Sequence, residues 1–214
     1  MRTRSLIALA GVAAVALVVA LAALATDGGR YSANLQPIPH NPAADGGSNV
    51  SGSAKMFVKG RQLSVSIHAS GLTPNLPHAM HIHGVLGDPN SCPPPSADVH
   101  NAYGVAPPDG LIDLGEGAPF YGPIQVSFTT SGDTSAGSGL VLSRMAMADA
   151  NGNLNYQRTF TIPKAVAKDL TQLHIVVHGL DLNGDGTYSN PAYTGAAALF
   201  EATLPVACGT INHK

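Results

Sequence analysis

Alternating apolar and polar residues mark two neighbouring segments in the first half of the chain, 52–58 and 62–70. In the second segment the apolar residues occupy every other position, namely Leu63, Val65 and Ile67. Successive side chains of a β-strand point to opposite faces, so these three would share one face. Residues 59–61 (KGR) separate the two segments over the length of a tight turn. The pattern therefore predicts a β-hairpin.

Short apolar segments bounded by glycine, proline and asparagine continue through the rest of the chain. Strands are expected at 124–130, 144–148, 154–162, 173–177 and 197–206. Asn151 and Gly152 separate the second of these from the third, and an Asn-Gly pair is a strong signal for a short hairpin. Residues 163–170 (PKAVAKDL) begin with proline, which a helix tolerates at its start, and predict a helical turn. Many short strands with Gly- and Pro-rich connections predict an all-β domain, a β-sandwich or flattened barrel.

The N-terminal residues show a different pattern. Residues 1–4 (MRTR) are basic, and an uncharged apolar run follows at 6–25 and ends in Ala-Leu-Ala. This order is typical of a cleaved export signal, but the run also approaches the ~20 residues that span a bilayer, so an uncleaved anchor is the alternative. We therefore expect residues 1–26 to be a signal peptide or membrane anchor, residues 27–48 a flexible linker, and residues 49–214 one domain. That domain would be secreted or held on the outer face of a membrane.

The composition of the chain excludes some classes of partner but does not indicate a function. Of the 214 residues only 11% are charged and the formal net charge is -2, so neither nucleic acid nor a membrane surface beyond the N-terminal segment is expected as a partner. The two cysteines, Cys92 and Cys208, can pair outside the reducing cytosol; two buried free thiols are the alternative. Cys92 lies within residues 84–123, which contain eight prolines. Irregular segments of this length carry function or are clamped by other parts of a domain.

Three of the nine histidines lie within residues 78–83 (HAMHIH). His81 and His83 would point to the same face of a strand, about 6.5 to 7 Å apart along the backbone, and two imidazoles at that separation can close onto one metal ion. His78 has the opposite parity. A His-x-His pair on its own is more often an ordinary polar strand face than a pair of metal ligands, so both interpretations remain open.

Other histidines could join this pair. His174 and His178 share one face of the strand predicted at 173–177, with His178 at its end, and His100 lies in the proline-rich segment beyond Cys92. Imidazole suits copper, zinc, iron and nickel, and a site made mostly of neutral imidazoles with an open position suits copper particularly well. No ligand role is expected for the remaining histidines, which are His40, His68 and His213.

Several of these segments, in this order, resemble motifs of the copper/zinc superoxide dismutases. Residues 78–83 are similar to that family's H-G-F-H-V-H strand, and residues 176–178 (VVH) to its later V-V-H strand. Residues 208–211 (CGTI) resemble its C-G-V-I ending, residues 111–115 (LIDLG) resemble its V-G-D-L-G, and Cys92 is placed like its other disulfide cysteine. The resemblance extends over most of the predicted domain.

This resemblance implies a Greek-key β-sandwich with one disulfide and a mononuclear copper site. His81, His83 and His178 match three copper ligands of the family. His100 is the expected fourth ligand, the histidine that in the family bridges to zinc. His78 would lie behind these ligands and support them.

The chain departs from the family at the zinc site and at the substrate position. Only Asp113 matches a zinc ligand, and Gly110 stands where a zinc histidine would be, so no family-type zinc site is expected and Asp113 would instead support the copper site. The resemblance implies that superoxide is converted to O2 and peroxide at copper. However, Pro205 replaces the arginine that attracts superoxide, which removes the nearest fixed cation.

Residues 71–78, which lead into His-Ile-His-Gly, also resemble the CHRD domain, an extracellular module with a related histidine-containing β architecture. This second resemblance implies a non-catalytic binding or structural module, in which the histidines pack and form hydrogen bonds without a metal. A copper carrier is a third hypothesis, intermediate between the two.

A possible calcium loop follows His178. Asp181, Asn183 and Asp185 have the D-x-N-x-D-G spacing of oxygen ligands in an EF-hand-type loop. Position twelve of this loop is Ala192 instead of the usual glutamate, and the preceding residues are expected to form a strand where an EF-hand has a helix. The alternative is a turn rich in Asx residues and glycine. Bound calcium would stiffen the loop beside His178.

Overall fold

The computed structural model describes residues 28–41, 48–101, 104–189 and 200–214. The expected signal peptide or anchor at 1–26 lies outside these ranges. Within them, no helix is long and apolar enough to cross a membrane.

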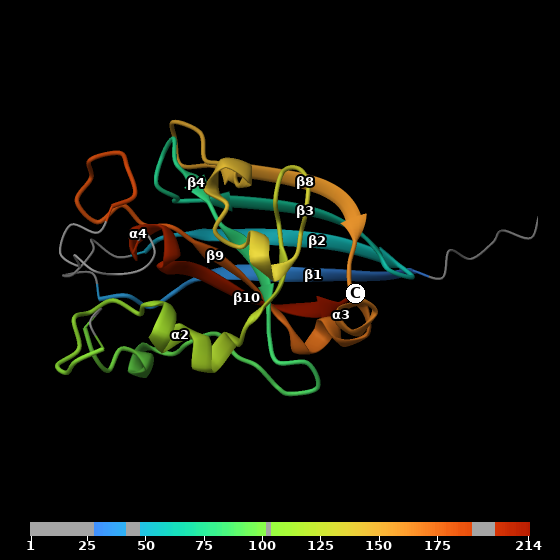
Figure 1. The fold of residues 1–214 in the computed structure, drawn as a ribbon, viewed down its shortest axis with the longest axis horizontal. Helices are drawn as coiled ribbons and strands as arrows, with labels where there is room; N and C mark the ends of the chain where they lie inside the picture. Colours follow the sequence, from blue (N-terminus) through green and yellow to red (C-terminus); the bar gives the residue numbers. More distant parts are fainter. Residues whose placement is uncertain (1–27, 42–47, 102–103, 190–199) are drawn as a thin grey trace, which may run out of the picture.

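Most of the described chain forms one antiparallel sheet of eight strands in the order β6-β5-β9-β10-β1-β2-β3-β8. These strands are β1 (Gly28–Pro37), β2 (Ser51–Lys59), β3 (Gln62–Ser70), β5 (Met80–His83), β6 (Ile124–Ser127), β8 (Leu154–Thr161), β9 (His174–His178) and β10 (Pro205–His213). Two short strands, β4 (Pro77–His78) and β7 (Ala146–Met147), form a separate sheet. In Figure 1, β1, β2, β3 and β8 run side by side along the molecule. The predicted all-β class, a sandwich or flattened barrel, is confirmed.

One hydrophobic core fills the curl of the large sheet. It joins side chains of β2 and β3, such as Met56, to side chains of β5 and β9, such as Ile82 and Val177. The alternating residues of the predicted hairpin are all buried in this core, namely Leu63, Val65 and Ile67. Burial of an aliphatic side chain of this size contributes about 1.5–3 kcal/mol. The period of two in the sequence therefore determined which face of β3 turned inward.

The described helices are short: α2 (Leu114–Tyr121), α3 (Lys164–Asp169) and α4 (Phe200–Thr203). α3 forms at the predicted helical turn. α2 forms inside the proline-rich segment, where no helix was expected. A capping box starts it, because the Asp113 carboxylate accepts the Glu116 N–H (2.9 Å) while the Glu116 carboxylate accepts the Asp113 N–H (3.1 Å).

Both faces of β9 are buried. Ile175 and Val177 point into the main core, whereas Val176 joins a second cluster that includes Tyr121 of α2 and Cys208 of β10. The proline-rich segment with α2 therefore covers the outer face of β9 and β10. In Figure 1 this segment lies on the opposite side of β10 from β2 and β3.

The disulfide fastens this cover to the sheet. Cys92, in the proline-rich segment, is bonded to Cys208 in β10 across 116 residues of sequence, with the two Cα atoms 5.7 Å apart. The predicted pairing is therefore confirmed, and the alternative of two buried free thiols is wrong.

Two expected boundaries are wrong. Residues 28–37, placed in a flexible linker, form β1, which is paired with both β2 and β10. The strand expected at 197–206 begins only at Pro205, because residues 200–203 form α4; residues 197–199 lie outside the described part of the chain.

The Asn-Gly pair forms a turn, but it does not join paired strands. The Gly152 N–H donates to the Asp149 carbonyl (3.0 Å), which closes the turn. The flanking strands then pair elsewhere, β7 with β4 and β8 with β3. The predicted hairpin is therefore wrong in its pairing, although its turn is present.

Removal of the disulfide should destabilise the protein strongly. The chain-entropy model gives up to about 4–5 kcal/mol for a loop of this length. We expect a Cys92→Ala/Cys208→Ala variant to lose several kcal/mol of unfolding free energy, measured by urea denaturation. Wild type unfolded in the presence of a reductant should show the same loss. A variant as stable as the oxidised wild type would show that the disulfide is not needed to hold the proline-rich segment against the sheet.

Candidate metal centre

Three histidines meet on the outer face of the sheet. His81 and His83 lie on β5 and His178 ends the adjacent β9. One nitrogen from each ring lies within 4.8 Å of the others, and all three side chains are buried. We call His81, His83 and His178 the histidine cluster. Because Ile82 and Val177 point into the core, the cluster faces the opposite side, which α2 covers. The predicted common face of His81 and His83 is confirmed.

A backbone carbonyl fixes the protonation of each ring. The three contacts are His81 Nε2 to Gly139 O (2.9 Å), His83 Nδ1 to Gly122 O (2.8 Å) and His178 Nδ1 to Thr203 O (2.8 Å). A carbonyl oxygen can only accept a hydrogen bond, so each of these ring nitrogens must carry the proton. In a neutral imidazole the other nitrogen then has a free lone pair.

Three ring nitrogens are thus left with a lone pair. They are Nδ1 of His81, Nε2 of His83 and Nε2 of His178. The first two atoms are 3.3 Å apart, and no described group forms a hydrogen bond with the third, although it is buried. Two lone pairs at this distance repel each other, and a buried acceptor without a donor costs free energy. A cation between the rings would remove both penalties, so the histidine cluster could hold a metal ion.

Burial keeps these rings neutral. Loss of solvation lowers the pKa of His83 to about 3 and that of His178 to about 4. The pKa of His81 is also lowered, first by burial and then by the neighbouring His178 and His83. Neutral imidazole is the form that binds a metal.

The carbonyls come from three separate segments, and two of them belong to glycines. A Cβ on Gly122, whose φ is 76°, would lie 2.8 Å from the Gly84 backbone. A Cβ on Gly139 would lie 2.7 Å from the Ile124 side chain and 3.4 Å from His81 Nε2. The absence of a side chain at these two positions therefore allows the backbone to approach the rings.

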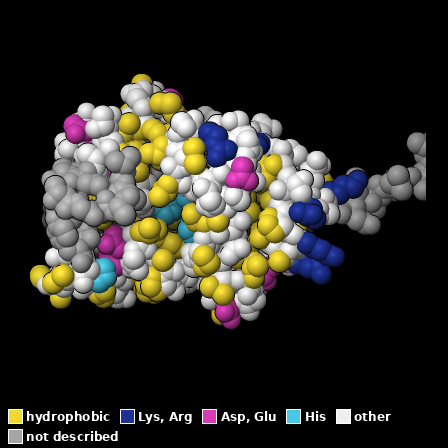
Figure 2. All heavy atoms as spheres, viewed as in Figure 1, with side chains coloured by type: hydrophobic (Ala, Val, Ile, Leu, Met, Phe, Trp, Pro, Cys, Tyr) yellow, Lys and Arg dark blue, Asp and Glu magenta, His cyan; other side chains and the backbone are white. Residues whose placement is uncertain are grey.

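A cavity of about 240 Å³ opens in front of the cluster. Besides the three histidines, it is lined by Tyr121, Thr203, Gly122 and a set of apolar residues, Leu114, Ala118, Pro123, Ile124 and Leu140. In Figure 2, histidine side chains are visible within a surface bordered mainly by hydrophobic side chains. A metal ion in the cluster would have one side turned toward this cavity.

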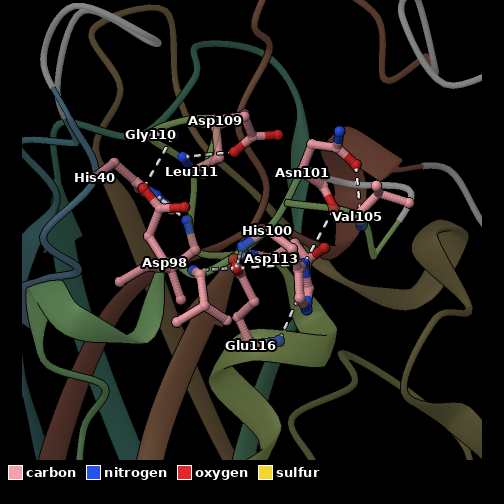
Figure 3. Close-up of polar contacts among 12 residues, drawn as sticks. His40, Asp98, His100, Asn101, Val105, Asp109, Gly110, Leu111, Asp113 and Glu116 are labelled. Atoms are coloured by element: carbon pink, nitrogen blue, oxygen red, sulfur yellow. Dashed lines mark hydrogen bonds and ion pairs between the residues drawn. The ribbon is translucent and has the colours of Figure 1, made fainter. Parts of the chain in front are cut away.

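His100 lies elsewhere. It belongs to a second group of potential ligand atoms, with Asp113 and Glu116, and not to the histidine cluster. The backbone N–H groups of Val99 (2.7 Å) and His100 (2.9 Å) both donate to Glu116 Oε1, and the His100 ring lies 3.4 Å from the same oxygen (Figure 3). The structure thus does not support His100 as the fourth copper ligand. Asp113, expected to support the copper site, caps α2 and is grouped with His100 and Glu116 instead of the histidine cluster.

Two other histidines lie beside the cluster. His78 is buried, and its ring nitrogens are 3.0 Å from the carbonyls of His178 and Thr73, so it contacts the backbone of a cluster residue. His174 lies directly opposite His83 across the two strands, and its Nε2 is 2.9 Å from the Thr210 hydroxyl. Neither belongs to the histidine cluster.

His40, for which no ligand role was expected, has a structural role that the sequence did not reveal. His40 is buried, accepts the Ile112 N–H at Nδ1 (2.9 Å) and donates from Nε2 to the Pro205 carbonyl (2.8 Å). It therefore ties the segment before α2 to the start of β10, as Figure 3 shows for its contacts on the α2 side. A polar residue next to Pro-Ile-Pro carries no periodic signal that could have revealed this contact.

The oxygens of the possible calcium loop are used within the loop. Asp181 accepts the N–H groups of Gly184 and Gly186 (both 2.8 Å), and Asp185 accepts that of Thr187 (2.8 Å). These are the contacts of the alternative, an Asx-rich turn. Asn183 accepts the N–H of Asp185 (3.1 Å). Ala192 lies outside the described residues.

A buried carboxylate that the sequence did not single out supports the same loop. Glu201 of α4 accepts the N–H groups of Leu182 (2.9 Å) and Ser189 (2.6 Å). The loop is therefore fixed to the helix that supplies the Thr203 carbonyl.

Comparison of the sequence with protein-family profiles and with curated proteins finds no match. The resemblances to the copper/zinc superoxide dismutases and to the CHRD domain thus stay predictions, and the geometry of the cluster has to support any functional proposal.

The buried histidines should make stability depend on pH. Below pH 6.5 the unfolded chain takes up protons at these positions, while the folded protein does not until about pH 4 or 3. The free energy of unfolding of the metal-free protein should therefore fall as the pH decreases from 6.5 to 4.5. Urea midpoints at several pH values measure this slope. His178→Gln should flatten it, whereas the exposed control His68→Gln should leave it unchanged; equal slopes in all three proteins would contradict the assignment.

Proposed function

We propose that this chain is a copper-binding protein whose ion is held by Nδ1 of His81, Nε2 of His83 and Nε2 of His178. The observation that carries the proposal is the grouping of three buried imidazoles, with one nitrogen of each within 4.8 Å of the others, whose protonation is set by three backbone carbonyls. Metal-ligating histidines usually donate their other N–H to a carbonyl or carboxylate in this way, which fixes the ring and makes it a better ligand.

The nature of the donors favours copper. All three are neutral imidazole nitrogens, and no carboxylate or thiolate is among them. Nitrogen sites bind Cu²⁺ more tightly than the other divalent ions of the first transition series. Zinc is the main competitor, because three histidines with an open fourth position also form catalytic zinc sites. Copper, when bound, would supply one-electron redox chemistry next to the cavity.

Superoxide dismutation is the second candidate function. The cavity favours it, because it gives a small molecule access to the position that an ion would occupy. The absence of any Lys or Arg among the described lining residues disfavours it. Pro205, which stands in the place of the family's arginine, begins β10 and pairs with His178.

The disulfide supports an exported protein. A bond between Cys92 and Cys208 persists in oxidising compartments, so the domain would work outside the cytosol, secreted or held on a membrane by its N-terminal segment.

Copper retention tests the proposal. Metal-free full-length protein is loaded with copper, washed with a chelator of known affinity, and analysed for metal per chain, with and without excess zinc. We expect one copper per chain. Removal of a group that only supports a metal ligand lowers affinity by about 10–100-fold. Because His178 is a proposed ligand itself, His178→Gln should lower the copper affinity by at least that factor.

The exposed variant His68→Gln serves as the matched control and should bind copper as wild type does. Equal copper uptake by wild type and His178→Gln would contradict the ligand assignment. No retained copper would favour the module in which these histidines only pack. Superoxide decay on the same samples separates a dismutase from a carrier.

A further inference from the structure

Apart from the histidine cluster, the lining of the cavity is mostly apolar. Leu114 and Ala118 of α2, Ile124 of β6 and Leu140 lie there, and the described lining contains no Lys, Arg, Asp or Glu. None of the described lining residues would therefore place a positive charge beside a ligand in this cavity, and the metal ion itself would supply the attraction.

Most polar side-chain atoms at the cavity already form hydrogen bonds within the protein. Each cluster ring donates its single N–H to a carbonyl, and the Thr203 hydroxyl donates to the Phe200 carbonyl (2.8 Å). Tyr121 presents its ring to His83, with the centroids 4.7 Å apart, while its hydroxyl is buried near Gly117 of α2 and has no hydrogen-bond partner in the described part of the chain. Among the described lining residues, this buried hydroxyl is the single side-chain donor left unpaired, and no cationic side chain joins it.

Two arginines, Arg144 and Arg158, are held by hydrogen bonds to other segments. Arg144 donates to the Ser138 hydroxyl (2.8 Å) and to the Ser131 carbonyl (3.3 Å). Arg158 donates to the carbonyls of Thr129 (2.7 Å) and Gly132 (2.6 Å). Neither guanidinium lines the cavity.

These surroundings select against anions. An anion that leaves water for an apolar cavity loses its hydration and needs fixed cations or donors in return. A small neutral molecule loses little, and apolar cavities of comparable size bind such molecules as xenon.

We propose that this cavity admits a small neutral molecule, of the class of dioxygen, nitric oxide and carbon monoxide, to the ion held by the histidine cluster, and disfavours small anions, superoxide included. The inference rests on the proposed copper site and specifies its ligand class.

Carbon monoxide and azide are the probes. Carbon monoxide is added to protein loaded with Cu(I) and followed by its infrared stretching band, and azide is added to protein loaded with Cu(II) and followed by its absorption band. We expect carbon monoxide to bind to one site per chain. Azide should bind weakly, and Leu140→Arg, which places a cation at the partly exposed edge of the cavity, should tighten it about tenfold or more.

Leu86→Arg is the matched control, because Leu86 is similarly exposed and does not line the cavity. It adds the same charge and should leave azide binding as in wild type. Azide binding to wild type as tight as to Leu140→Arg would overturn the proposal, as would a failure of carbon monoxide to bind a protein that retains copper.

Xenon tests the cavity without any metal. Metal-free protein should bind xenon, detected by xenon NMR, and Leu140→Arg should weaken that binding. If xenon binds but copper does not, the proposed copper site is overturned, and the proposed class of copper ligand is overturned with it. If copper binds but xenon and carbon monoxide do not, only the inference about the cavity is overturned.

Discussion

Three hydrogen bonds from imidazole N–H groups to backbone carbonyls determine what the histidine cluster can do. They leave one unprotonated nitrogen on each ring, in a group of imidazoles close enough together to share one metal ion. Each carbonyl belongs to a segment outside β5 and β9, so the direction of the rings depends on how these segments are fastened to the sheet. The disulfide and the capping box hold the segment that ends at Gly122. Glu201 secures the helix that ends at Thr203, and Asp133 and Arg144 bind Ser138 next to Gly139.

The sequence predicted those parts of the fold that follow a local period. The alternation in β2 and β3 identified the hairpin and its buried face, and the parity of His81 and His83 placed both rings on one side of β5. The position of His178 at the end of an apolar strand was equally readable. These are properties of single strands, which a linear pattern can record.

Features that depend on distant contacts could not be predicted. β1 was assigned to a linker because residues 27–48 are rich in Gly, Ala, Asn and Pro and show little periodicity. In the structure only Ala33 and Leu35 of the ten β1 residues are buried, so the strand has little apolar alternation to reveal it. α2 is a short helix in a segment rich in proline. Its capping residues are local, but Glu116 also accepts the N–H groups of residues 99 and 100, and this more distant contact has no signal in the sequence. The Gly122 and Gly139 carbonyls carry no signal in the sequence, because every residue has a carbonyl. His100 was assigned to the cluster only from a resemblance, and the structure places it beside Glu116.

The protonation of the three rings in the metal-free protein tests the central claim most directly. Long-range ¹H–¹⁵N NMR at pH 7.5 distinguishes the two neutral forms of each histidine. His81 should carry its proton on Nε2, and His83 and His178 should carry theirs on Nδ1, which leaves three lone pairs for a metal ion. A proton on His81 Nδ1, directed at His83 Nε2 across the 3.3 Å contact, would show instead that the rings form a hydrogen bond with each other and are packed without a metal.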